Sequence, residues 1–271
     1  GYLDSTTRSQ TYYRNVVWSA DFEAPDYTLG ALCPYQAAAG QQGWWNPQQY
    51  EVGYIMADPN NASQMICRIG GSNGYGGNVY SPVISMLPAD NDMLVVSFWY
   101  RPGAGTLSDV VAVTNSARAQ LIKVIFDRPT GHFVAGGAGN YDTGVAFTAG
   151  SDYAIMIIAS PAAGKFDLVV NGVTAARNQP FAAASFTATG HVNVYGGGNT
   201  AGGSPMYSYF DTVVVSSMPS VATPVFSPDL MSISGPTPIA ITCDTAGATI
   251  RCTTDGSEPS ATHGTVIASG E

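Results

Sequence analysis

The sequence predicts an all-β protein made of one large antiparallel sandwich and a short second module. Apolar runs of strand length recur from end to end, separated by clusters of glycine, proline, asparagine and aspartate. The 31 glycines and 17 prolines suit many turns and disfavour long helices. No segment sustains the apolar periodicity of a helix, so we expect strands throughout.

The predicted strands follow one another in order along the chain. Two connections are typical hairpin turns, namely Asp127–Gly131 and the dipeptide Asn171-Gly172. The nearly continuous apolar run Tyr153–Ile158 predicts a central strand that is covered on both faces. The expected strands of the sandwich are Val16–Glu23, Glu51–Ala57, Gln64–Ile69, Val79–Met86, Met93–Tyr100, Val110–Thr114, Leu121–Asp127, His132–Ala135, Tyr153–Ala159, Phe166–Asn171, His191–Tyr195 and Tyr207–Ser216.

A polar, proline-bearing stretch divides the chain into two parts. It runs from Ser216 to Pro224, and alternating strand patterns return after it at Ile239–Cys243 and Thr249–Thr253. We therefore expect an N-terminal arm over 1–15 and the sandwich over 16–217. A linker over 218–228 and a small module over 229–271 follow.

The charge and composition exclude several classes of partner. A net charge of -9 argues against nucleic acid and against anionic membrane surfaces. No run approaches the roughly 18 apolar residues of a membrane span. Only 11% of residues are charged, a habit of extracellular β proteins. The polar start Gly1–Ser5 shows no signal peptide, so we expect a mature or trimmed product located outside the cell.

Several segments of the large domain carry a family resemblance. They include Asp21–Pro25, Val96–Tyr100, Phe166–Gly172 and the closing strand Tyr209–Val215. With them, residues 16–217 resemble the concanavalin A-like lectin/glucanase superfamily, in the form of the laminin-G-like modules of bacterial secreted proteins. The resemblance implies a jelly-roll sandwich. It does not fix a function, since this scaffold serves lectins, hydrolases, lyases and adhesion modules.

The tail carries a second resemblance. The run Ala248–Pro259, opened by Pro224–Pro228, looks like the chitobiase/β-hexosaminidase C-terminal-type repeat of bacterial carbohydrate-active proteins. This implies a small immunoglobulin-like β-sandwich module with a structural Asp255-Gly256 turn. Such domains continue through further strands, whereas this chain stops at Glu271. Either the chain was cut, or a neighbouring chain supplies the missing strand.

The four cysteines predict two local disulfides. No C-x-x-C pair occurs and the histidines are scattered, which argues against a zinc site. In a polar chain of low charge the natural pairing is Cys33–Cys67 and Cys243–Cys252, with four buried thiols as the alternative. Cys243 and Cys252 flank an expected turn, where facing strand positions lie roughly 4.5–5.5 Å apart and within disulfide range.

Aromatic and amide side chains mark two candidate carbohydrate-binding segments. Aromatic rings pack on the C–H faces of pyranose rings, and amides serve the hydroxyl groups of a neutral polysaccharide. The first segment surrounds Trp44-Trp45, although one tryptophan capping the core and one covering a loop is the alternative. The second is the glycine-rich connection Gly70–Tyr80, which also fits a plain loop. The candidate ligands are Trp44, Trp45, Asn46, Tyr50, Asn73 and Tyr75.

One structural calcium ion is a further expectation. Sandwiches that resemble this one hold such an ion near the first and last strands, through a carboxylate and backbone carbonyls. Glu23 and Asp211 occupy those positions, and exposed strand-end acids are the alternative interpretation.

No segment shows a recognisable catalytic constellation. The clustered acids of glucanases, in the spacing Glu-x-Asp-x-x-Glu, are absent, and Asp21 and Glu23 lie in the first strand instead. The run Gln120–Lys123 lacks the histidine of a lyase cluster, and no nucleophile elbow occurs. The histidines His132, His191 and His263 sit in no motif.

These observations favour a non-catalytic carbohydrate-binding or adhesion module of a bacterial secreted protein, with a polysaccharide or other glycan as its partner. One alternative is a structural subunit of a surface layer or filament that assembles with itself through strand addition. A second alternative is a glycanase or polysaccharide lyase whose active residues follow no familiar motif.

Overall fold

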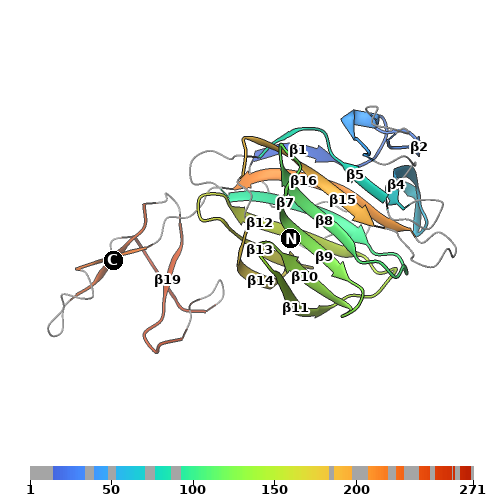
Figure 1. Cartoon of the computed structure of the whole chain (residues 1–271). Coiled ribbons are helices and arrows are strands. Elements are labelled where there is room, and N and C mark those ends of the chain that lie inside the picture. Colours follow the sequence, from blue (N-terminus) through green and yellow to red (C-terminus); the bar gives the residue numbers. More distant parts are fainter. Residues whose placement is uncertain are drawn as a thin grey trace. The chain divides into compact units, whose positions relative to one another are not determined.

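A computed structural model describes most of the chain, which forms two compact units, Gly1–Met218 and Pro219–Glu271 (Figure 1). The described residues are 15–33, 40–47, 53–70, 77–86, 93–182, 186–196, 207–218, 224–228, 238–244, 248–257, 259 and 263–269.

Sheet A is the larger sheet of the first unit and has nine strands in its described part. They are joined in the order β14-β13-β12-β7-β16-β4-β3-β2, and β1 also pairs with β16. All these pairings are antiparallel. The strands are β1 (Asn15–Ala20), β2 (Gly30–Ala31), β3 (Gly53–Asp58), β4 (Asn61–Ile69), β7 (Met93–Arg101), β12 (Tyr153–Ser160), β13 (Lys165–Val170), β14 (Val173–Pro180) and β16 (Ser208–Met218).

Sheet B has seven strands in the described part of the chain, again antiparallel. Its order is β11-β10-β9-β8-β15-β5, with β6 also on β15, and β8 to β10 lie side by side in Figure 1. The strands are β5 (Gly77–Tyr80), β6 (Ile84–Ser85), β8 (Asp109–Asn115), β9 (Gln120–Asp127), β10 (His132–Gly136), β11 (Asn140–Ala146) and β15 (Thr189–Gly196).

One apolar core lies between the two sheets, because alternate residues of each strand point to the same face. Val192 and Val194 of β15 are buried in it, opposite Val113 and Val111 of β8. The same cluster contains Phe98 of β7, Phe126 of β9, Phe133 of β10 and Phe210 of β16. The all-β jelly-roll sandwich predicted from the sequence is therefore confirmed.

The two predicted turns form as expected, but the predicted covering of one strand was wrong. Asn171 and Gly172 both have positive φ, 49° and 79°, as a tight two-residue hairpin between β13 and β14 requires. The amide of Gly131 donates to the Asp127 carbonyl between β9 and β10. Strand β12 is internal to sheet A, yet its outward residues, among them Met156 and Ile158, are only half-buried.

The described part of the second unit contains two two-stranded antiparallel sheets. One pairs β17 (Val225–Ser227) with β18 (Ala240–Thr242), and the other pairs β19 (Ile250–Cys252) with β20 (Thr265–Ile267). The predicted hairpin that would bring Cys243 opposite Cys252 is therefore wrong, because β18 and β19 pair with other strands. No disulfide joins these two cysteines.

Within the described residues, no helix has the length and apolar character that crossing a membrane would need.

Candidate functional site

Trp44 belongs to the core and does not form part of a surface site. Its side chain is fully buried, and its ring lies 5.6 Å from Phe22 and 5.7 Å from Phe210, measured between centroids. Its Nε1 donates a hydrogen bond of 3.1 Å to the hydroxyl of Tyr27. Asn46 is also fully buried. The prediction that Trp44 and Asn46 contact a sugar was wrong, because neither reaches solvent.

Trp45 lies instead at the surface of sheet B. Successive side chains of an extended segment point in opposite directions, so burial of Trp44 turns Trp45 outward. Trp45 forms a β-bridge with Tyr80 of β5, with backbone hydrogen bonds of 2.9 and 2.8 Å. The two half-buried rings lie 5.5 Å apart. This pair places two aromatic side chains at one edge of the outer face of sheet B.

The β8–β9 hairpin brings Arg118 onto this aromatic pair. The side-chain oxygen of Asn115 accepts hydrogen bonds from the amides of Ala117 and Ala119, and Arg118 takes a φ of 63° in the turn. The guanidinium carbon of Arg118 then lies 4.0 Å from the ring centroid of Trp45. This is the geometry of a cation–π contact, which holds an exposed positive charge in a defined place.

A row of amide side chains runs from β9 to β5 beside the aromatic pair. Gln120 Nε2 donates to Asn193 Oδ1 over 3.3 Å. The Asn193 amide in turn donates to Asn78 Oδ1 and, over 3.0 Å, to the Val79 carbonyl. The row crosses β8, where Ala112 is the residue paired with Asn193. A short side chain there leaves room for the amides to meet.

His191 closes the cluster beside Tyr80. Its Nδ1 lies 2.9 Å from the carbonyl oxygen of Ser81, so Nδ1 carries the proton and donates. The His191 and Tyr80 rings are nearly perpendicular, with an interplanar angle of 83° and centroids 6.1 Å apart. His191 is buried, and its ring orientation is fixed by the backbone of the segment after β5.

Lys123 of β9 extends the same face toward β10. The register places Tyr80, Asn193, Ala112, Lys123 and Gly136 in one row across the sheet. A Cβ on Gly136 would lie 2.8 Å from Lys123 Cε and 3.1 Å from its Cβ. The missing side chain of Gly136 is therefore what lets the Lys123 stem lie across β10.

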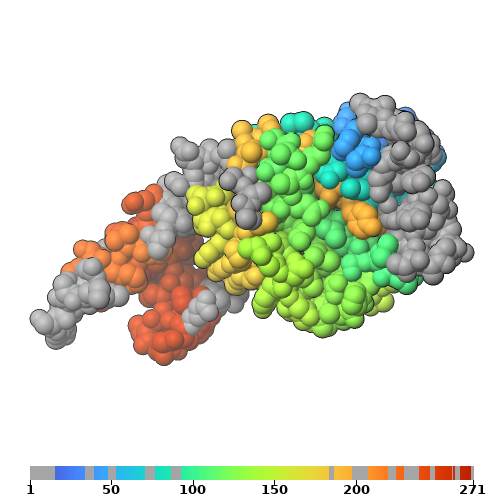
Figure 2. Space-filling model, viewed as in Figure 1, coloured from blue at the N-terminus to red at the C-terminus, as the bar shows by residue number. Residues whose placement is uncertain are grey.

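These residues form what we call the outer-face cluster, and it combines aromatic rings, amides and two cations. Of the described residues, none forms an ion pair with Arg118 or Lys123; the ion pairs of sheet B involve Arg128 and His132. The green part of the surface in Figure 2 contains β8 to β11. The members are Trp45, Asn78, Tyr80, Arg118, Gln120, Lys123, His191 and Asn193.

Three of the predicted sugar ligands, Tyr50, Asn73 and Tyr75, lie outside the described residues. Gln120 and Lys123 stand in a run that lacks the histidine of a lyase cluster, and Arg118 and Asn193 belong to no sequence motif. One signal was present in the strict alternation His191-Val192-Asn193-Val194-Tyr195, which puts three polar or aromatic side chains on one face. No local pattern could reveal that a hairpin turn carries Arg118 onto Trp45.

The two acids predicted to hold calcium both accept backbone hydrogen bonds. Glu23 Oε1 accepts from the amide of Met65 over 2.8 Å, and Asp211 Oδ1 accepts from Thr212 over 2.7 Å. Ala20 of β1 pairs with Val213 of β16. Glu23 follows Ala20 and Asp211 precedes Val213, so both acids lie toward the same end of this strand pair. Among the described residues no group of three acidic, histidine or cysteine side chains gathers as a metal site. Calcium binding stays a prediction.

Cys33 and Cys67 are buried thiols, and the predicted disulfide between them is absent. Cys33 follows β2, Cys67 lies on β4, and β3 runs between these strands. The two thiols are close enough to interact, because Cys33 is one of the groups that raise the pKa of Cys67. Burial raises the pKa of Cys33 to about 12 and that of Cys67 well above its ordinary value.

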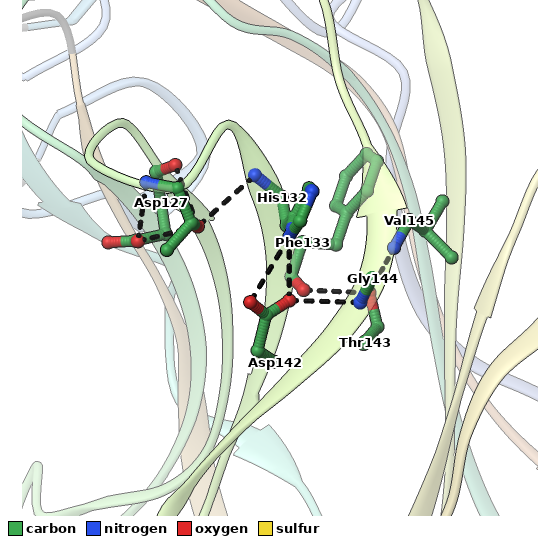
Figure 3. A network of polar contacts seen from close by, with 8 residues as sticks. Asp127, His132, Phe133, Asp142, Thr143, Gly144 and Val145 are labelled. Atoms are coloured by element: carbon green, nitrogen blue, oxygen red, sulfur yellow. Dashed lines mark hydrogen bonds and ion pairs between the residues drawn. The ribbon is translucent and has the colours of Figure 1, made fainter.

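A second polar cluster lies on β10 and β11, at the far side of sheet B (Figure 3). His132 Nδ1 lies 3.0 Å from Asp142 Oδ1, which also accepts from the amide of Gly144 over 2.9 Å. These contacts hold the pKa of Asp142 below its usual value, the Gly144 amide being the larger cause. Both side chains are solvent-accessible, and the pair joins the two strands.

Comparison with protein-family models finds no match, and neither does comparison with curated proteins. The resemblance of the tail to the chitobiase-type repeat therefore gains no support. Similar solved structures include a sialidase, domain 4 of an extracellular arabinanase from Geobacillus stearothermophilus in complex with arabinotriose, and a cellulose-induced protein.

These three structures are 13%, 14% and 13% identical to this chain, with TM-scores of 0.47, 0.45 and 0.45. The matches cover 65%, 75% and 75% of this chain, and 17%, 93% and 98% of those proteins. The chain thus spans only 17% of the length of the sialidase. The likeness is one of fold.

Proposed function

We propose that the protein is a non-catalytic glycan-binding module and that the glycan lies across the outer-face cluster of sheet B. The observation that carries this proposal is the position of the Trp45–Tyr80 pair beside the amide row of Gln120, Asn193 and Asn78. Aromatic rings beside fixed amides match the two kinds of surface that a sugar presents, apolar C–H faces and hydroxyl groups.

The cluster is held in place before any ligand arrives. Asn193 is buried and bonded on both sides, so the exposed Gln120 side chain has a fixed acceptor and keeps its carbonyl for a sugar hydroxyl. The bridge to Trp45 fixes the backbone of Tyr80. Preorganisation of this kind reduces the entropy lost on binding. Such a module would act outside the cell, where structural polysaccharides are found.

Affinity gel electrophoresis on a panel of neutral and acidic polysaccharides tests this proposal. We expect at least one polymer to retard the protein. Tyr80→Ala should weaken that binding by about tenfold, since aromatic anchors commonly contribute more than 1 kcal/mol. Gln120→Ala should weaken it less. The matched control is Tyr141→Ala, because Tyr141 is an exposed tyrosine on β11 of the same sheet.

All three variants are compared by thermal melting, so that loss of folding is not read as loss of binding. Migration unchanged by every polymer of the panel would contradict the proposal. Equal weakening by Tyr141→Ala and Tyr80→Ala would show that the glycan lies elsewhere on the molecule.

A further inference from the structure

We infer that the outer-face cluster selects glycans that carry carboxylate groups, with Arg118 and Lys123 as the cations that pair with them. The inference rests on the glycan-binding function proposed above and names its class of ligand. The low charge of the sequence suggests a neutral polysaccharide as the ligand. The positions of Arg118 and Lys123 favour an acidic polysaccharide instead.

Arg118 presents its guanidinium in the form that suits a carboxylate. Its Cζ lies over the Trp45 ring, 4.0 Å from the ring centroid, and 5.8 Å from the centroid of Tyr80. The guanidinium N–H groups, for which the described residues offer no carboxylate, match the two oxygens of a carboxylate. The contact also covers part of the Trp45 ring. A ligand therefore meets a cation at this end of the cluster, in addition to the Tyr80 ring.

The carboxylates of the described strands of sheet B form hydrogen bonds or ion pairs with groups other than Arg118 and Lys123. Asp109 accepts from Arg128 and from Ser208, and Asp127 from Ser108 and Thr130. Asp142 is bonded to His132 and Gly144. Among the described residues, none of these acids pairs with Arg118 or Lys123. Within the part of the chain that the structure describes, Arg118 and Lys123 thus have no carboxylate partner.

The spacing of the two cations fits a polymer better than a single sugar. Tyr80, which bridges to Trp45, and Lys123 are the ends of a row that crosses β5, β15, β8 and β9. Three strand spacings amount to roughly 14 Å. Asn193 lies between these ends and accepts a hydrogen bond from the exposed Gln120 side chain, so separate sugar units would meet Arg118 and Lys123, with Gln120 near the hydroxyl groups between them.

The test compares acidic polymers with their own neutral esters. Polygalacturonate, alginate and polyglucuronate are each titrated calorimetrically into the whole protein beside the corresponding fully esterified polymer. We expect at least one uronan to bind about tenfold or more tightly than its ester, because a hydrogen-bonded charge pair is lost on esterification. Its affinity should fall with added salt, while that of the ester should not.

Variants assign the effect to the two residues. Arg118→Ala and Lys123→Ala should each reduce uronan affinity about tenfold and leave ester binding nearly unchanged. Arg118→Lys should recover only part of the loss, since lysine lacks the planar fork. Arg177→Ala on β14 of sheet A removes a cation elsewhere and is the matched control, with no effect expected.

Equal affinity for uronans and esters, or a preference for neutral polymers, would overturn this inference and leave glycan binding intact. A preference for sulfated polymers such as dextran sulfate would overturn the assignment to carboxylates. Absence of binding to any charged or neutral polymer would remove both this inference and the function on which it rests.

Discussion

Two consecutive residues, Trp44 and Trp45, occupy different environments: Trp44 is fully buried and Trp45 is half-buried. Both are aromatic, and the sequence cannot say which of two consecutive tryptophans points inward. The choice is made by Phe22 and Phe210, which come from distant strands and surround Trp44. Trp45 is left to pair with Tyr80 at the surface. Of the alternative interpretation, in which one tryptophan caps the core and the other covers a loop, the first half describes Trp44, whereas Trp45 lies against Tyr80 of strand β5.

Replacing the two tryptophans should therefore have unequal effects on folding. We expect Trp44→Ala to lower the free energy of unfolding by about 3–5 kcal/mol, since it empties a fully buried site. Trp45→Ala should cost about 1 kcal/mol or less. Denaturant unfolding followed by circular dichroism measures both values. Similar losses for the two variants would show that Trp44 does not fill the core.

The cysteines should differ in reactivity in the same way. The thiolate is the reactive form of cysteine. Burial raises the pKa of Cys33 to about 12, and it raises the pKa of Cys67 as well. Cys243 and Cys252 are only partly buried. We expect iodoacetamide to modify Cys243 and Cys252 in the native protein well before Cys33 and Cys67, as read by peptide mass spectrometry. Four unreactive cysteines after unfolding in urea would instead indicate disulfides.

Asp142 should make part of the stability depend on pH. Its pKa is lowered by the Gly144 amide and by His132, so the folded state favours the charged form. A carboxyl with a lowered folded pKa stabilises above its unfolded pKa of about 3.9, and that contribution is lost as pH falls through the folded pKa.

We therefore expect the urea midpoint of the wild-type protein to be higher than that of Asp142→Asn at neutral pH. The difference between the two midpoints should disappear in acid. Asp26→Asn, an exposed turn residue, is the control. A difference that grew toward low pH would contradict the assignment.

At the scale of elements, strands with a clear apolar face could be predicted, and edge strands could not. Strands β9, β12 and β13 overlap predicted runs because burial largely alternates along each of them, and β15 overlaps one although most of its residues are buried. Strands β11 and β14 were missed, since each lies at a sheet edge and is mostly polar and exposed. The outer-face cluster depends on register between four strands and on one hairpin turn, which no local pattern encodes.

The two missed strands contact each other and join the sheets at one side. The Ala138 amide donates to the Pro180 carbonyl there, and a Cβ on Gly137 would come 1.9 Å from that oxygen. We expect Gly137→Ala to destabilise the fold by about 2 kcal/mol or more, because the new Cβ would force the backbone at Pro180 or at residue 137 to shift. Gly139→Ala, where nothing lies within 4 Å, should stay within about 0.5 kcal/mol in thermal or urea unfolding. Equal effects would show that this junction is loose.

At the scale of the whole molecule, the first unit contains its own core. The described cluster of buried apolar residues draws all its members from between Ala20 and Val215. The unit Gly1–Met218 also contains every residue of the outer-face cluster. The tail was recognised as separate from its linker composition, but its strand pairing was misjudged because each of its strands has only three residues.

A chain that ends at Met218 should therefore fold and bind as the full chain does. We expect an unchanged melting temperature for the main transition and the same glycan affinity, measured by calorimetry on both proteins. A fragment that aggregates, or that melts markedly lower, would show that the second unit supports the first.

Strand β16 has a consequence for how the sandwich is made. It is the final strand of the first unit in sequence, yet it pairs with β1, β4 and β7 in the interior of sheet A. Until residues 208–218 leave the ribosome, sheet A consists of two separate halves, β14-β13-β12-β7 and β4-β3-β2. Pairing between distant segments makes such folding slow. We therefore expect sheet A to close only after β16 has been synthesised, so that its two halves join late in folding.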